Sequence, residues 1–343
     1  MVDRSLSTWQ GMRTRDPRRL VLGSAQWGVA YGIANRSGPP SDRELERLIA
    51  LARDAGIRTI DTARAYGPSE ARIGRVVAGA ADWRVVTKLA PDAGGPGIEV
   101  GEALDRVAAS LAQSRAALGL GTLPIVLLHR HAHRHAFGGK LWRTLRAERE
   151  AGRIGQLGIS TANPEEAWAA LDDPEVECLQ VATSLLDLRL HRQGFFPRAR
   201  ELGRTVYVRS VYLQGVAHLG AARLPAFLAP LAPTLQTIER FAGELGIAPR
   251  PLYLAFVREL PGVHPILGCE SADQLAQGLR DWEDETVDGA LLATLLERLP
   301  TADAEMVDPA RWPAREAVFP EPAPATLQAT PPGPITGWTR LAT

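Results

Sequence analysis

The sequence predicts a single α/β domain, a (β/α)₈ or TIM barrel, followed by a proline-rich C-terminal extension. Short apolar segments alternate with helical patterns, and about 250 residues hold eight such pairs. Parallel neighbours need helical crossovers, so this alternation predicts a parallel sheet. An open doubly wound sheet is the alternative, but Gly23-Ser24-Ala25-Gln26 lacks the glycine-rich fingerprint that usually follows the first strand of such a sheet.

The strands are recognised as apolar or β-branched runs bounded by turn or capping residues. The second run leads into a polar loop, because Asp61 ends it and Gly67-Pro68 marks a turn soon after. The predicted strands span residues 20–23, 57–60, 85–88, 123–129, 155–160, 178–182, 205–210 and 264–268.

Capping residues mark several of the helices between these strands. Ser41 and Glu44 form a capping box, and Gly56 ends that helix. Asn163 and Ser271 stand at the cap position of two later helices. The remaining helical patterns span residues 69–79, 98–118, 141–151, 234–245 and 252–260.

The chain divides into three predicted parts: a charged leader at 1–17, the barrel at 18–312 and an extension at 313–343. The extension is rich in Pro, Ala and Thr and lacks the apolar periodicity of a ninth unit. We expect it to be disordered or laid over the barrel as an extended segment.

Composition limits the classes of function. The formal net charge is zero, which argues against a nucleic-acid partner. No run approaches the roughly 20 apolar residues of a membrane span, and the leader lacks the apolar core of a signal peptide. Cys178 and Cys269 lie in apolar runs, which predicts buried free thiols in a reducing compartment. We expect a cytoplasmic protein, and its richness in Ala, Arg, Gly and Pro favours a bacterial source.

Four polar residues gather at one rim of the predicted barrel. Asp61 ends the second strand, Lys88 the third and His129 the fourth, while Tyr66 lies on the loop after the second. Active sites of such barrels lie at the carboxyl ends of the strands. Any one of these residues alone reads as a capping or surface residue, but four on one rim predict an active site.

These segments resemble the aldo-keto reductases, and the resemblance covers residues 20–312. The segment Tyr31-Gly32-Ile33-Ala34-Asn35 is similar to a bacterial branch of the family. The matching segments are Asp61-Thr62-Ala63-x-x-Tyr66-Gly67, Val86-Thr87-Lys88, Leu127-Leu128-His129, Gly158-Ile159-Ser160, Gln180, Arg209-Ser210, Leu213-Gln214-Gly215, Gly268 and Gln274-Leu275.

The resemblance implies reduction of a carbonyl by a nicotinamide cofactor, with Tyr66 as the acid. A phenol is a slow proton donor near neutral pH, and a neighbouring ammonium makes it a better one by stabilising the phenolate. Lys88 supplies that ammonium in this reading, and Asp61 supplies the counter-charge that a buried lysine needs. His129 would donate a hydrogen bond that orients the carbonyl oxygen.

Cofactor contacts are also implied by resemblance. Ser160 and Gln180 match residues that bind the nicotinamide amide, and Arg209 stands where an aromatic ring often stacks on the nicotinamide. The other implied contacts are Ser210, Leu213, Gly215, Gly268, Glu270 and Gln274. The family default is NADPH. NADH is the alternative, because Glu270 stands where Lys, Arg or Ser often holds the 2′-phosphate, and Gly278 replaces an Asn that usually contacts adenine.

Predicted substrate contacts are Gln26, Trp27 and Tyr31 on the first rim loop and Tyr212 after the seventh strand. They suit a small polar carbonyl compound that is sugar-like or a secondary metabolite, although Trp27 and Tyr212 could equally pack the loops. The histidine-rich run 129–135 reads as a solvated loop, not a metal site, because its arginines oppose a cation.

Two other functions stay open on the sequence. One is a cofactor-binding regulatory subunit with little turnover, and the other uses the same site for alcohol oxidation or epimerisation. The sequence leaves the choice between a monomer and a homo-oligomer open.

Overall fold

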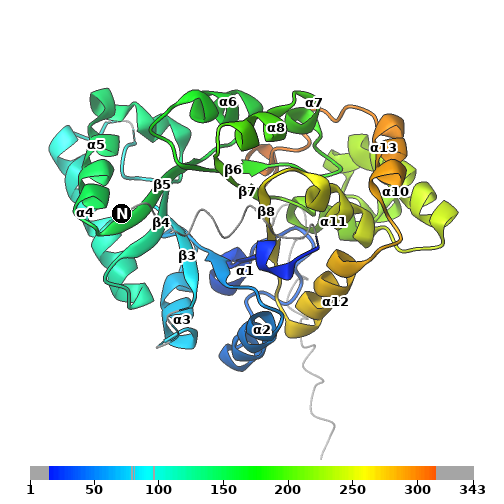
Figure 1. Ribbon diagram of the computed structural model, residues 1–343, viewed down its shortest axis with the longest axis horizontal. Helices are drawn as coiled ribbons and strands as arrows, with labels where there is room; N and C mark the ends of the chain where they lie inside the picture. The colour runs from blue at the N-terminus through cyan, green and yellow to red at the C-terminus, as the bar shows by residue number, and fades with distance from the viewer. Residues whose placement is uncertain (1–14, 79, 81, 96, 314–343) are drawn as a thin grey trace, which may run out of the picture. The chain divides into compact units, whose positions relative to one another are not determined.

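The computed structural model describes residues 15–78, 80, 82–95 and 97–313. Eight parallel strands close into a barrel in chain order, with β1 paired to β8, which confirms the (β/α)₈ prediction (Figure 1). The strands are β1 Val21–Gly23, β2 Thr59–Asp61, β3 Arg84–Lys88, β4 Leu123–Leu128, β5 Ile154–Ser160, β6 Cys178–Ala182, β7 Thr205–Arg209 and β8 Val263–Gly268.

The α-helices lie around these strands, as the predicted crossovers require (Figure 1). Before the seventh strand they are α1 Ala25–Gly28, α2 Asp42–Asp54, α3 Ser69–Val76, α4 Val100–Leu118, α5 Ala136–Glu150, α6 Pro164–Asp172, α7 Arg189–Arg192 and α8 Phe195–Glu201. After it they are α9 Val216–Leu219, α10 Ala232–Leu245, α11 Arg250–Glu259, α12 Ala272–Glu283 and α13 Gly289–Arg298. Short 3₁₀ helices are η2 Pro17–Arg19, η3 His131–Arg134, η4 Leu213–Gly215, η5 Ala221–Arg223, η6 Ala226–Leu231 and η7 Pro309–Arg311.

The chain divides into two units, residues 1–312 and 313–343. Of the predicted leader, only residues 15–17 are described, and of the predicted extension only Pro313. The domain boundaries therefore stay predictions. Within the described residues, no helix is long and apolar enough to cross a membrane.

The predicted helix caps are present. Ser41 Oγ accepts a hydrogen bond from the Glu44 backbone N–H at 3.2 Å, and Asn163 and Ser271 cap α6 and α12 in the same way. The capping-box prediction was wrong in its second part, the hydrogen bond from the Ser41 backbone N–H to the Glu44 side chain. The Glu44 carboxylate accepts from the Ala272 N–H at 2.7 Å, so it joins α2 to the start of α12.

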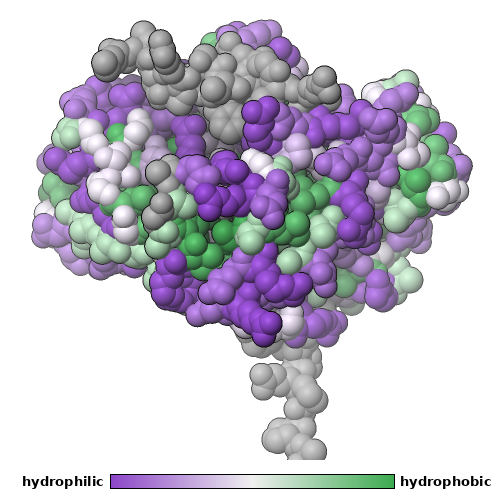
Figure 2. Space-filling view, turned by 60° about the horizontal axis from the view of Figure 1, so that its bottom comes forward, coloured by the Kyte–Doolittle hydropathy of each residue, from purple (hydrophilic) through white to green (hydrophobic). Residues whose placement is uncertain are grey.

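Apolar side chains from the strands form the centre of the barrel. One buried cluster takes residues from β1, β3, β4, β6, β7 and β8, among them Tyr207 and Cys178. Both cysteines are free and buried, as predicted. Hydrophilic residues cover much of the face in Figure 2, with apolar ones in its middle. Among the large hydrophobic residues that the structure describes, Val29 stands out as exposed.

Candidate active site

Asp61 and Lys88 form a buried ion pair at the carboxyl ends of two neighbouring parallel strands, β2 and β3. Lys88 Nζ lies 2.8 and 2.9 Å from the two Asp61 oxygens and donates to Thr62 O at 2.9 Å. The Lys88 side chain is only 1% exposed. Burial acts to lower the pKa of Lys88, but the charge of Asp61 and the phenol of Tyr66 outweigh it, so the pKa is raised and the ammonium keeps its proton.

Tyr66 lies on the loop between β2 and α3, with its ring centre 5.0 Å from Lys88 Nζ. Backbone bonds hold this loop on β3, because the Thr62 N–H donates to Val86 O at 2.8 Å and the Arg64 N–H to Lys88 O at 3.3 Å. Helix α1 packs closely on its other side. A Cβ at Gly28 would lie 1.7 Å from the Tyr66 carbonyl oxygen, so only glycine fits there.

His129 follows β4 directly and completes the group. Its ring centre lies 6.3 Å from that of Tyr66, and the two planes meet at 85°. Within the described residues, its Nδ1 atom is buried without a hydrogen-bond partner. Burial, followed by the charges of Lys88 and Arg209, lowers the pKa of His129 to about 3. The ring is therefore neutral near pH 7 and has one N–H to donate. We call Asp61, Tyr66, Lys88 and His129 the rim tetrad.

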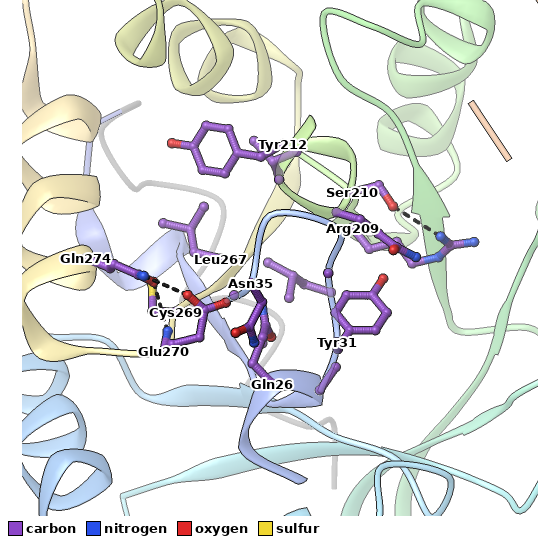
Figure 3. Close-up of a pocket in the computed structure, with 18 of the residues that line it drawn as sticks. Gln26, Tyr31, Asn35, Arg209, Ser210, Tyr212, Leu267, Cys269, Glu270 and Gln274 are labelled. Carbon is purple, nitrogen blue, oxygen red and sulfur yellow. Dashed lines mark hydrogen bonds between the residues drawn. The ribbon is translucent and has the colours of Figure 1, made fainter. Parts of the chain in front are cut away.

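A cavity of about 440 Å³ lies at the carboxyl ends of the strands, and Asp61 and Tyr66 are the members of the rim tetrad that line it, whereas Lys88 and His129 do not. Tyr66, Asp61 and Gln180 line one part of it, and Glu270 and Gln274 line another. Figure 3 shows Tyr31 and Arg209 facing Gln274 and Glu270 across this space. Polar side chains from several strand ends and loops line the cavity, which suits a ligand with several polar parts.

Most residues predicted to bind the cofactor line this cavity, and two do not. The lining ones are Gln180, Arg209, Ser210, Gly215, Gly268, Glu270 and Gln274. Leu213 is 1% exposed and packs inward. Ser160 lies behind Gln180 and donates to its Oε1 at 3.3 Å. Gln180 in turn donates to Asp61 Oδ1 at 2.6 Å, which connects β6 directly to the rim tetrad.

Backbone and side-chain bonds fix Arg209 at the end of β7. Its Nη2 donates to Thr161 O at 3.0 Å and its Nη1 to Ser210 Oγ at 3.2 Å. Ser210 has φ +64°, a left-handed conformation that is rare for a non-glycine residue, and Leu213 and Gln214 share it at +44° and +53°. Such strain tends to persist where the surroundings enforce it, often at binding sites.

Glu270 and Gln274 form a closed pair at the start of α12. The Glu270 N–H donates to Gln274 Oε1 at 2.9 Å, and Gln274 Nε2 donates to Glu270 Oε2 at 2.6 Å (Figure 3). Both residues line the cavity, so the Glu270 side chain brings a carboxylate to its wall.

Gln26, Tyr31 and Tyr212 line the cavity among the predicted substrate contacts, whereas Trp27 does not. Trp27 is 1% exposed and donates its indole N–H to Cys269 O at 2.9 Å, so it supports the loop from within. The Tyr212 ring is directed toward the end of the cavity that holds Gln274 (Figure 3). Its ring centre lies 4.4 Å from that of His218.

The lining residues that the sequence did not predict include the ionisable groups of His218, Arg250 and Asp281. Arg250 and Asp281 belong to α11 and α12 and pair at 3.0 Å. Neither follows a strand, so the rule that found the rim tetrad could not find them. Asp281 is only 5% exposed, and its place among the apolar residues of α12 was the feature of the sequence that could have pointed to it.

A closed parallel barrel with a polar cavity at the carboxyl ends of its strands defines the class of barrel enzymes. Within that class, the chain belongs to the Aldo/keto reductase family, whose model matches residues 19–288. This confirms the resemblance seen in the sequence.

Known relatives are distant. An aldo-keto reductase of Mycolicibacterium paratuberculosis is 34% identical over 142 residues, which cover 38% of this chain and 45% of the relative, so the match spans less than half of that relative. A Pseudomonas aeruginosa protein described as an aldo-keto reductase is 25% identical, with a TM-score of 0.57 over 81% of this chain and 90% of that one. An aldo/keto reductase from Klebsiella pneumoniae, solved with NADP and acetate, is 21% identical and shares the fold, with a TM-score of 0.59 over 82% and 92%.

Proposed function

We propose that this protein reduces an aldehyde or ketone to an alcohol with NAD(P)H, and that Tyr66 donates the proton. The observation that carries the proposal is the Lys88–Asp61 ion pair, buried next to the Tyr66 ring with Nζ 5.0 Å from the ring centre. A lysine and an aspartate buried together at a rim cost desolvation energy, which a role in stabilising a phenolate explains.

In this mechanism, a bound nicotinamide supplies the hydride to the carbonyl carbon. Tyr66 gives its proton to the carbonyl oxygen, and Lys88 stabilises the phenolate that remains. Asp61 keeps Lys88 charged and in place. Neutral His129 donates a hydrogen bond to the carbonyl oxygen, and with a pKa of about 3 it does not act as the acid itself.

The cavity residues fit a dinucleotide. Gln180, Arg209 and Ser210 would hold its nicotinamide end, with Ser160 and Leu213 supporting them from behind. Gly215, Gly268, Glu270 and Gln274 would hold the adenosine end, where the capped N-terminus of α12 favours phosphate. NADPH is the family default, and the Klebsiella relative was solved with NADP. NADH is the alternative, because the Glu270 carboxylate repels a 2′-phosphate and can accept a bond from a ribose hydroxyl.

The substrate we propose is a small, polar, sugar-like carbonyl compound. Gln26 and Tyr31 offer amide and phenol groups on the same cavity as Tyr66, which suits a hydroxylated molecule. Oxidation of an alcohol or epimerisation would use the same groups in reverse.

Oxidation of NADPH and NADH, followed by absorbance against a panel of aldehydes and ketones, tests the proposal. Tyr66→Phe should lose at least about 100-fold in kcat with little change in cofactor Kd, because it removes only the transferred proton. Tyr253→Phe is the matched control, since its buried hydroxyl has no partner in the described part of the chain. Full activity of Tyr66→Phe would refute the assignment, and tight cofactor binding without turnover would favour a regulatory subunit.

A further inference from the structure

A second buried carboxylate lies behind the Tyr66 loop, where the proposed mechanism assigns it no role. Glu70 is in the first turn of α3, and its side chain is only 1% exposed. One oxygen accepts from Thr87 Oγ1 at 2.6 Å and from Ser114 Oγ at 2.8 Å. The other pairs with the guanidinium of Arg64. Three partners therefore offset the cost of burying this charge.

Two of those partners belong to the segments that carry Tyr66 and Lys88. Arg64 lies two residues before Tyr66, and its backbone N–H donates to Lys88 O at 3.3 Å. Thr87 directly precedes Lys88 in β3, and consecutive strand residues point to opposite faces. Glu70 thus contacts the outer face of β3 at the point where the inner face presents Lys88. Ser114 ties the same carboxylate to α4.

We propose that Glu70 is a positioning residue for carbonyl reduction. Through Arg64 and Thr87, its carboxylate holds the Tyr66 loop and the end of β3 in one fixed arrangement, so that the phenol stays beside Lys88. This inference rests on the proposed role of Tyr66 as proton donor. Small displacements of a reacting group have large effects on rate, so we expect turnover to depend on the contacts that Glu70 makes.

A simpler role for Glu70 is stabilisation of α3, because an acid in the first turn of a helix interacts well with the helix dipole. That role needs no buried bonds to β3 or to the loop. Glu102 provides the comparison. It stands in the first turn of α4, where among the described residues it pairs with Arg106 at 2.7 Å, and its side chain is 55% exposed. Replacing Glu102 removes the helix-dipole contribution and leaves the Tyr66 loop untouched.

Glu70→Gln tests the proposal, because glutamine keeps the shape and can still accept from Thr87 and Ser114, while Arg64 loses its counter-charge. We expect kcat to fall at least tenfold with the KM for cofactor within twofold. The deuterium isotope effect from cofactor labelled at the transferred position should rise, since the chemical step becomes slower. Glu102→Gln should leave all three unchanged.

Arg64→Gln provides a second route, because Arg64 is 23% exposed and its loss is less of a threat to folding. It should reproduce the effect of Glu70→Gln, and the double variant should be no worse than either single one. If both single variants keep the wild-type kcat and isotope effect, the proposal is overturned.

Hydrogen exchange separates this proposal from the proton-donor assignment. In Glu70→Gln, the backbone amides of residues 62–67 should exchange at least fivefold faster than in the wild type, measured without substrate. Unchanged exchange would overturn the positioning role whatever the kinetics show. An active Tyr66→Phe would instead overturn the proton-donor role and leave the exchange result standing.

Discussion

At the scale of residues, His129 shows how surroundings define a group's chemistry. In the unfolded chain its ring would bind a proton near pH 6.5, while in the fold burial and then the charges of Lys88 and Arg209 lower its pKa to about 3. Between these two values the unfolded state holds more protons than the folded state. The stability that the neutral ring contributes is therefore present above pH 6.5 and is lost as the pH falls toward 3.

This shift predicts a pH-dependent stability difference between the wild type and His129→Gln. From pH 7 to pH 5 the wild type should lose about 1–2 kcal/mol more unfolding free energy than the variant, which has no ring to protonate. Urea unfolding at each pH measures this. His264, whose pKa is lowered to about 4, is present in both proteins and cancels in the comparison. Equal losses in the two proteins would contradict the assignment.

Glu270 carries a prediction about cofactor choice. Glu270→Gln removes the negative charge at the cavity wall but keeps a side chain that can pair with Gln274. The ratio of kcat/KM for NADPH to that for NADH should rise about tenfold, because repulsion of the 2′-phosphate is relieved. Asp273→Asn, which changes an exposed acid in the same first turn of α12, is the control. A ratio unchanged by Glu270→Gln would place the 2′-position away from residue 270.

At the scale of elements, the contact between α1 and the Tyr66 loop depends on one glycine. Gly28→Ala would place a Cβ 1.7 Å from Tyr66 O, so one of the two segments must move. We expect a loss of about 2–3 kcal/mol in unfolding free energy and a lower kcat. Gly243→Ala in α10 meets no atom within 4 Å and should be neutral or stabilise by about 0.5–1 kcal/mol. Thermal and urea unfolding measure both, and equal stability of the two variants would contradict the prediction.

Contacts between elements that are distant in the chain are the part of the structure that the sequence did not predict. Caps and strand ends depend on near neighbours in the chain, so Ser41, Asn163 and the rim tetrad could be predicted. The contact of the first rim loop with the loop after β7 could not. The Ile33 N–H donates to Gln214 O at 3.0 Å, and that bond depends on a positive φ at Gln214 that no residue type signals. The sequence left Trp27 as either a substrate contact or a residue that packs the loops, and the hydrogen bond from its N–H to Cys269 O supports the second.

At the scale of the whole molecule, the barrel was predictable because its signal repeats. Each strand is a short apolar run, and errors of one or two residues at its ends leave the number and sequence of the units unchanged. The cavity was only half predictable. The part near Tyr66 follows from which residues end the strands, whereas Arg250 and Asp281 reach it from helices, and only the packing of α11 on α12 brings them together.

The predicted boundary at residue 312 makes a last prediction. A chain ending at Trp312 should keep its thermal midpoint within about 2 °C, because β1 and β8 already close the barrel and the Pro-rich composition of 313–343 offers little to bury. A chain ending at Asp288 should unfold at a clearly lower temperature, since it lacks Leu292 and Leu295, which are buried in α13. Thermal unfolding compares the two with the full chain. A lower midpoint on removing 313–343 alone would contradict the boundary, and a lower kcat at an unchanged midpoint would assign the extension to the substrate site.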